Sequence, residues 1–220
     1  MELQRELLLL LAALLQYPRL DVRETTRRCV ALMLMVGAGE PRPAVETLAG
    51  QPSVLAEAST PEDRDGMAPT SLMSQFAAFV ESTSLGHLEE IYTATFDLNP
   101  VCCPYVGYHL FGNDPKRADL MVKLQQGYRE AGIDVGSELP DHLSLLLRYL
   151  AHIDDPELGG ELAGMLIGPA LEKMASSLDG ANPYALVVRS AERVVRHVVE
   201  VPHTSHSAPR TAEMGGDDRV

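Results

Sequence analysis

The chain has 220 residues, enough for one domain of ordinary size with a closed hydrophobic core. Its formal net charge of -13 repels phosphate backbones, which argues against nucleic-acid binding and favours a cationic partner such as an arginine-bearing peptide. A role in solubility alone explains the charge equally well. Three cysteines are too few for a disulfide framework or a four-thiolate zinc site, and they suit a reducing, cytoplasmic setting.

Apolar residues recur at helical spacing along most of the chain, and no strand pattern of useful length appears. The sequence therefore predicts an all-α fold, a single-domain multi-helix bundle. The domain is expected to span residues 1–200, and residues 201–220, which lack periodicity, are expected to form a disordered C-terminal tail. The predicted helices cover roughly residues 3–16, 21–35, 44–58, 71–82, 88–97, 105–111, 115–131, 140–153, 157–178 and 183–200.

The first predicted helix is apolar on nearly every face, which indicates a central element rather than a surface one. Its apolar run, Leu7–Leu15, is shorter than the roughly 20 residues that a membrane-spanning helix needs. Glu2 and Glu6 flank this run, where a signal peptide would carry a basic leader. We therefore expect a buried helix and no membrane insertion.

Polar and aromatic residues gather in the middle of the chain, between residues 88 and 150. The helix predicted over 88–97 places Tyr92 and Phe96 on its apolar face, and Asn99-Pro100 ends it. Farther along, Glu138-Leu139-Pro140-Asp141-His142-Leu143 has two interpretations. A carboxylate and an imidazole could serve acid–base chemistry. The simpler interpretation is a helix that starts at Pro140, where Asp141 gains roughly 0.3–1 kcal/mol from the helix dipole.

Candidate metal ligands are sparse and poorly spaced. Cys102 and Cys103 are adjacent, and His109 is the only ligand type near them, so packing at a helix corner is the preferred interpretation. His203 and His206 lie in the predicted tail. Walker, dinucleotide-binding and Gly-x-Ser-x-Gly motifs are absent from the sequence. We predict no catalytic residue, no metal site and no cofactor, and the composition suits a groove that holds an amphipathic peptide.

An ordered set of motifs resembles a known family. The set is Glu90-x-Tyr92-x-x-x-Phe96-Asp97, Pro104-Tyr105, Tyr128-x-x-x-Gly132 and Glu138-Leu139-Pro140-Asp141-His142-Leu143. It resembles the TorD/DmsD/NarJ-type chaperones that mature molybdenum redox enzymes. Tyr92-Thr93-x-Thr95-Phe96-Asp97, followed by Cys102-Cys103, is most similar to the NarJ-like branch, the nitrate reductase delta subunits. Leu15-Gln16-Tyr17-Pro18 also suits this branch.

The resemblance implies a cytoplasmic, system-specific chaperone that is not an enzyme. Its partner would be the apo catalytic subunit of a molybdenum oxidoreductase of the dimethyl-sulfoxide-reductase family, such as a nitrate reductase. The chaperone would bind the N-terminal segment or twin-arginine-type leader peptide of that subunit. It would support insertion of the molybdenum cofactor before membrane docking or export. The resemblance implies eight peptide-binding residues: Tyr92, Phe96, Pro104, Tyr105, Glu138, Pro140, Asp141 and His142.

Two departures and one alternative accompany this resemblance. The family more often has an aromatic-x-x-Leu-Phe set where this chain has Ala94-Thr95-Phe96, and Val106-Gly107 replaces the acidic-Ser pair of the TorD branch. The alternative is a generic helical interaction scaffold without a role in cofactor assembly.

In the chaperone interpretation the protein is a monomer or weak homodimer. Replacing Asp141 or Tyr92 by Ala is expected to weaken peptide binding without unfolding the chain. The predicted acidic rim of the groove comprises Glu89, Glu90, Asp97, Glu138 and Asp141.

Overall fold

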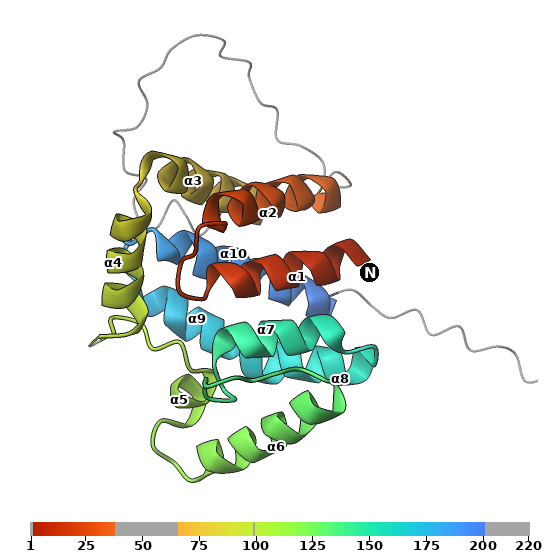
Figure 1. Ribbon diagram of the computed structural model, residues 1–220. Coiled ribbons are helices and arrows are strands. Elements are labelled where there is room, and N and C mark those ends of the chain that lie inside the picture. Colours follow the sequence, from red (N-terminus) through yellow and green to blue (C-terminus); the bar gives the residue numbers. More distant parts are fainter. Residues whose placement is uncertain (1, 38–65, 99, 201–220) are drawn as a thin grey trace, which may run out of the picture.

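Helices form all the extended regular structure in the part of the chain that the computed structural model describes, which is residues 2–37, 66–98 and 100–200 (Figure 1). This confirms the predicted all-α class. The elements are α1 (Glu2–Leu14), α2 (Val22–Val36), α3 (Pro69–Ser82), α4 (Leu85–Phe96), α5 (Val106–Phe111), α6 (Lys116–Glu130), α7 (Leu143–His152), α8 (Pro156–Glu161), the π-helical segment η2 (Leu162–Ile167), α9 (Gly168–Ser177) and α10 (Tyr184–Glu200). The helix predicted over 44–58 and the tail predicted over 201–220 lie outside the described residues.

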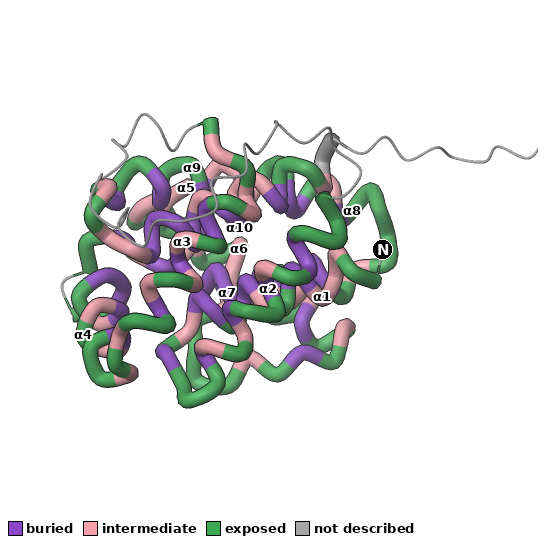
Figure 2. The backbone as a smooth tube through the Cα atoms, turned by 90° about the horizontal axis from the view of Figure 1, so that it is seen from above, coloured by how far each residue is buried: buried purple, intermediate pink, exposed green. Residues whose placement is uncertain are grey.

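Helix α1 is central, as its apolar character predicts. It packs against α2 on one side and α7 on the other, and it also touches α10 (Figure 1). Leu7, Leu8, Leu11 and Leu14 are buried along it, whereas Leu9 is partly exposed. Helix α10 packs against α3 and α9 with Val187, Val188 and Val195 fully buried. Viewed from above, buried positions gather inside the bundle and α4 lies at one edge (Figure 2).

The long helix predicted over 157–178 is interrupted. Helix α8 runs into η2, whose last hydrogen bond joins the Gly168 N–H to the carbonyl of Ala163, five residues back. Pro169 follows in the first turn of α9 and has no N–H to donate. The interruption of the predicted helix therefore takes the form of a π-helical segment that ends at Gly168-Pro169. None of the described helices is long and apolar enough to span a membrane.

Helix α6 lies at the periphery, below α5 and α7 in Figure 1. Only Leu124 and Tyr128 on it are buried. The Tyr128 hydroxyl donates to the Pro140 carbonyl (O···O 2.7 Å), and its ring meets that of Tyr149 edge-on at 5.2 Å. Gly127 permits this approach, because a Cβ there would lie 2.5 Å from the Tyr149 hydroxyl oxygen. A few contacts of this kind hold α6 to the bundle.

Helix α7 begins later than predicted. Its first residue is Leu143, three positions after Pro140, and His142 is the N-cap. The cap forms because Nδ1 of His142 accepts a hydrogen bond from the Ser144 N–H (3.2 Å). Asp141 therefore lies outside the helix. The predicted stabilisation of Asp141 by the dipole of the first turn is wrong, and a different interaction explains its position.

Candidate functional site

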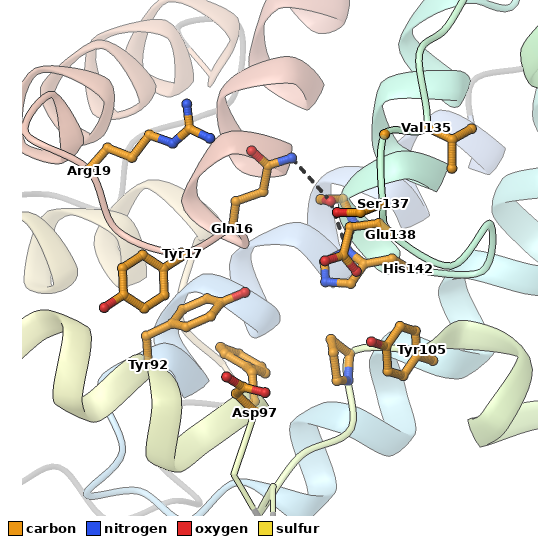
Figure 3. Close-up of a pocket in the computed structure, with 14 residues that line it drawn as sticks. Gln16, Tyr17, Arg19, Tyr92, Asp97, Tyr105, Val135, Ser137, Glu138 and His142 are labelled. Carbon is orange, nitrogen blue, oxygen red and sulfur yellow. Dashed lines mark hydrogen bonds between the residues drawn. The ribbon is translucent and has the colours of Figure 1, made fainter.

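A cavity of about 420 Å³ opens between the end of α1, the end of α4 and the loops that precede α5 and α7 (Figure 3). Its lining comprises Gln16, Tyr17, Arg19, Tyr92, Phe96, Asp97, Pro104, Tyr105, Val135, Gly136, Ser137, Glu138, His142 and Ser144. Six of the eight residues predicted to bind peptide are among them: Tyr92, Phe96, Pro104, Tyr105, Glu138 and His142. The other two, Pro140 and Asp141, do not line it. The cavity volume is typical of a ligand site.

One side of the cavity is formed by Tyr17, Tyr92 and Phe96, which we call the aromatic wall. The ring centroid of Tyr92 lies 5.6 Å from that of Tyr17 and 5.1 Å from that of Phe96. Tyr92 is only 7% exposed, and its hydroxyl donates to the Leu15 carbonyl (3.3 Å). Burial raises the pKa of Tyr92, and the carboxylates of Glu138 and Asp97 raise it further, so its phenol stays protonated. Tyr92 and Phe96 are thus core residues whose rings also line the cavity.

The opposite side is formed by Pro104, Tyr105 and His142. They lie in two short segments, 104–106 and 141–143, which we call the bridged wall. Tyr105 and His142 face each other in an isolated antiparallel bridge. The Val106 N–H donates to the Asp141 carbonyl (2.8 Å), and the Leu143 N–H donates to the Pro104 carbonyl (2.9 Å). This pairing brings together two motifs that the sequence separates by a loop and two helices.

The polar part of the lining is organised by His142. Because the Ser144 N–H donates to Nδ1 of His142, a neutral imidazole carries its proton on Nε2. The Ser144 hydroxyl also donates to Nδ1 (2.8 Å), and the Gln16 amide nitrogen donates to that hydroxyl oxygen (3.4 Å). Burial lowers the pKa of His142 despite the opposing effect of Glu138 and Asp141. The ring is therefore neutral near pH 7, and it lies beside the open space in Figure 3.

Three exposed charged residues line the mouth of the cavity: Arg19, Asp97 and Glu138. Of the predicted acidic rim, only Asp97 and Glu138 lie there. Glu89 and Glu90 do not line the cavity, and Glu90 pairs with His87 on the same helix (3.0 Å). The rim therefore carries two carboxylates and one guanidinium, fewer acidic groups than predicted.

Asp141 is fully buried, with 0% exposure, and this corrects its assignment to the rim. Its carboxylate accepts two hydrogen bonds from Arg117 at the start of α6: Nε to Oδ2 at 2.8 Å and Nη2 to Oδ1 at 3.4 Å. These hydrogen bonds raise the pKa of Arg117. Sequence reasoning missed Arg117, because one arginine after Lys116 in an exposed helical turn carries no distinguishing pattern. Asp141 and His142 are thus adjacent in sequence but have different hydrogen-bond partners, Arg117 for Asp141 and Ser144 for His142.

The cysteines belong to the packing rather than to the cavity lining. Cys29 and Cys102 are buried, and burial raises the pKa of Cys29 to about 12 and that of Cys102 to about 11. His109 contacts the Cys103 carbonyl through Nε2 (2.7 Å), not its thiol. No three His, Cys, Asp or Glu residues gather at metal-binding distance within residues 2–37, 66–98 and 100–200. His203 and His206 lie outside the described residues.

Comparisons with known proteins relate this architecture to a family. The model of the nitrate reductase delta subunit family matches residues 64–175, just over half of the chain and all of the motifs from Tyr92 to His142. A solved structure from Archaeoglobus fulgidus, of a protein proposed to be a redox enzyme maturation protein, shares the fold. Its TM-score is 0.53 at 20% identity, covering 87% of this chain and 93% of that one. No curated protein sequence matches the chain. The chain belongs to the nitrate reductase delta subunit family, the NarJ/TorD-type redox-enzyme maturation chaperones.

Proposed function

We propose that the cavity receives the N-terminal segment of the catalytic subunit of a molybdenum oxidoreductase. Family membership identifies the chain as a molybdoenzyme maturation chaperone of the nitrate reductase delta type. In our proposal it acts in the cytoplasm and holds the catalytic subunit in its apo form. Release follows insertion of the molybdenum cofactor, before the enzyme docks at a membrane or is exported. The segment that binds is the N-terminus itself or a twin-arginine-type leader peptide.

The observation that carries the proposal is a cavity with rings on one side and carboxylates at its mouth. Tyr17 and Tyr105 offer partly exposed aromatic surface to apolar side chains. Asp97 and Glu138 lie at the rim, where they attract a cationic residue of the same peptide. A formal charge of -13 over the whole chain speeds the encounter with a basic segment. This combination suits a peptide that carries apolar and basic residues.

The size of the cavity supports reversible binding. Burial of apolar side chains contributes roughly 25 cal/mol per Å². Ordering a flexible peptide offsets much of this gain, which leaves an affinity around micromolar. Such an affinity lets the chaperone release its partner once the enzyme is assembled.

The geometry of the polar residues favours binding over catalysis. A general acid–base pair needs its two groups within hydrogen-bond reach of each other or of a shared substrate proton. Here the Asp141 carboxylate is engaged by Arg117, and Nδ1 of His142 is engaged by Ser144. The described residues thus place the two side chains in separate networks. In our proposal the chain is not an enzyme and needs no cofactor of its own.

Co-purification followed by peptide titration tests the proposal. A tagged chain should bring down the apo form of a molybdoenzyme catalytic subunit, whereas a generic scaffold should not. The N-terminal peptide of that subunit should then bind the purified chain. Glu138→Lys should weaken this binding, because it places a cation at the mouth of the cavity. Glu172→Lys is the matched control, since it makes the same charge change on an exposed residue of α9 away from the cavity. Equal affinities of the two variants would contradict this site.

A further inference from the structure

The ring of Tyr105 is held from two directions. On one side the imidazole of His142 meets it edge-on, with ring centroids 5.6 Å apart. On another side the guanidinium carbon of Arg117 lies over the ring, 5.6 Å from its centroid. The same guanidinium lies 5.8 Å from the centroid of Tyr108 on α5. Arg117 therefore touches the back of a cavity residue without lining the cavity itself.

Arg117 is fixed in turn by the buried Asp141 carboxylate. The two hydrogen bonds form a fork, and charge-assisted pairs of this type are the stronger kind. The backbone leaves room for the pair at Gly107 in the first turn of α5. A Cβ there would lie 2.7 Å from Oδ2 of Asp141 and 3.0 Å from Cγ of Arg117. The Asp141 carbonyl also accepts the Val106 N–H, so one residue anchors both the arginine and the bridged wall.

We propose that Arg117 is a positioning residue of the peptide site: it holds Tyr105 and, through Asp141, the bridged wall in the shape that the peptide meets. The inference rests on the proposed function, because it assigns a role at the same cavity. It gives Asp141 an indirect role. The carboxylate does not contact the peptide and acts through the arginine that it holds.

A direct and an indirect role of Asp141 predict opposite changes in peptide affinity for the variant Arg117→Gln. If Asp141 recognised a basic residue of the peptide, removal of Arg117 would free its carboxylate and tighten binding. If Arg117 positions Tyr105, the same change weakens binding by about tenfold, and Asp141→Asn weakens it similarly. The double variant then loses no more affinity than either single variant, because each substitution alone already breaks the Arg117–Asp141 pair.

The test is a titration of the purified full chain with the fluorescently labelled N-terminal peptide of the co-purified catalytic subunit. Arg129→Gln is the matched control, an exposed arginine on the same helix with the same charge change. Arg117→Lys keeps the charge but loses the fork and the planar stack, so an intermediate loss is expected. Circular dichroism of each variant confirms that it is folded at the temperature of the titration.

A second comparison separates positioning from general destabilisation. In a Tyr105→Leu background the ring that Arg117 holds is gone, so Arg117→Gln should lower affinity by a smaller factor than it does in the wild-type chain. A purely structural role would instead lower affinity equally in both backgrounds, and that result overturns the inference. The inference is also overturned if Arg117→Gln binds the peptide as tightly as Arg129→Gln does, or more tightly. Should Arg117→Gln fail to fold, Arg117→Lys carries both comparisons, and the same outcomes decide. Failure of the wild-type chain to bind the peptide would instead reject the proposed function.

Discussion

The aromatic wall and the bridged wall face the same cavity, but different forces hold them in place. Tyr92 and Phe96 belong to a cluster of rings that continues into the core through Tyr184, whose centroid lies 5.6 Å from that of Tyr92 and 5.2 Å from that of Phe96. The bridged wall rests on two backbone hydrogen bonds and one buried ion pair. The aromatic wall is therefore fixed by ring packing, whereas the bridged wall combines backbone pairing and an ion pair with the buried side chains of Val106 and Leu143.

The largest effect is expected at the aromatic wall. Tyr92→Ala removes a ring that is 7% exposed and should destabilise the fold by about 3–5 kcal/mol, as other large-to-small aromatic changes do. This revises the sequence-based expectation that Tyr92→Ala leaves the chain folded. Urea denaturation followed by circular dichroism measures the change. Tyr92→Phe is the control, which loses only the hydrogen bond to Leu15 and about 1 kcal/mol.

Asp141→Ala should produce the next largest effect. It leaves the Arg117 guanidinium partly buried without its partner, at a cost of about 3 kcal/mol. The earlier expectation that this variant binds more weakly while keeping its stability is revised in the same way. The double variant Asp141→Ala/Arg117→Met should recover most of the lost stability, because no unpaired charge remains. Denaturation curves in which the double variant is less stable than the single one would show that the ion pair is not the cause.

A smaller, pH-dependent effect is expected from His142. Burial lowers its pKa in the folded state, so the unfolded chain binds the proton more readily. The stability that this residue contributes is therefore present near pH 7 and is lost as the pH falls below the unfolded pKa of about 6.5. His142→Asn keeps a side chain suited to the N-cap but removes the titration. Comparing the stabilities of the two proteins at neutral and mildly acidic pH should show a steeper decline for wild type, and parallel curves would contradict the assignment.

The smallest change in stability is expected at Tyr17, the exposed member of the aromatic wall. Its side chain is half exposed, so Tyr17→Ala loses mainly the edge contact with Tyr92 and should alter the free energy of unfolding by about 1 kcal/mol. It should nevertheless weaken peptide binding, because the ring lies at the cavity. Fluorescence titration and a thermal melt on the same preparation measure both quantities. Met165→Ala, which removes an exposed apolar side chain that does not line the cavity, gives the reference for nonspecific loss.

The helical periodicity of apolar residues, together with the Pro and Gly residues that end helices, was enough to predict the helices that surround the cavity. Tyr92 and Phe96 share a face because i and i+4 always do on a helix, and the motif order identified the loops that join them at the cavity. The start of α7 was predicted three residues too early. Pro140 fits a first turn, but its carbonyl is bound by Tyr128 and the cap forms at His142. Contacts from another helix decided that boundary, so local preference could not predict it.

The sequence by itself determined the all-α class and the central first helix, because local spacing and composition are present in every short window of the chain. The resemblance of its ordered motifs to a known family indicated six of the residues that line the cavity. Only the tertiary structure decided that Asp141 turns inward to Arg117 while His142 turns to the cavity. Adjacent residues differ in this way because the bridge between 104–106 and 141–143 sends successive side chains to opposite sides. The partner of Asp141 comes from α6, and Gln16, which follows α1, donates to the Ser144 hydroxyl beside His142. Only the folded chain brings these residues within reach.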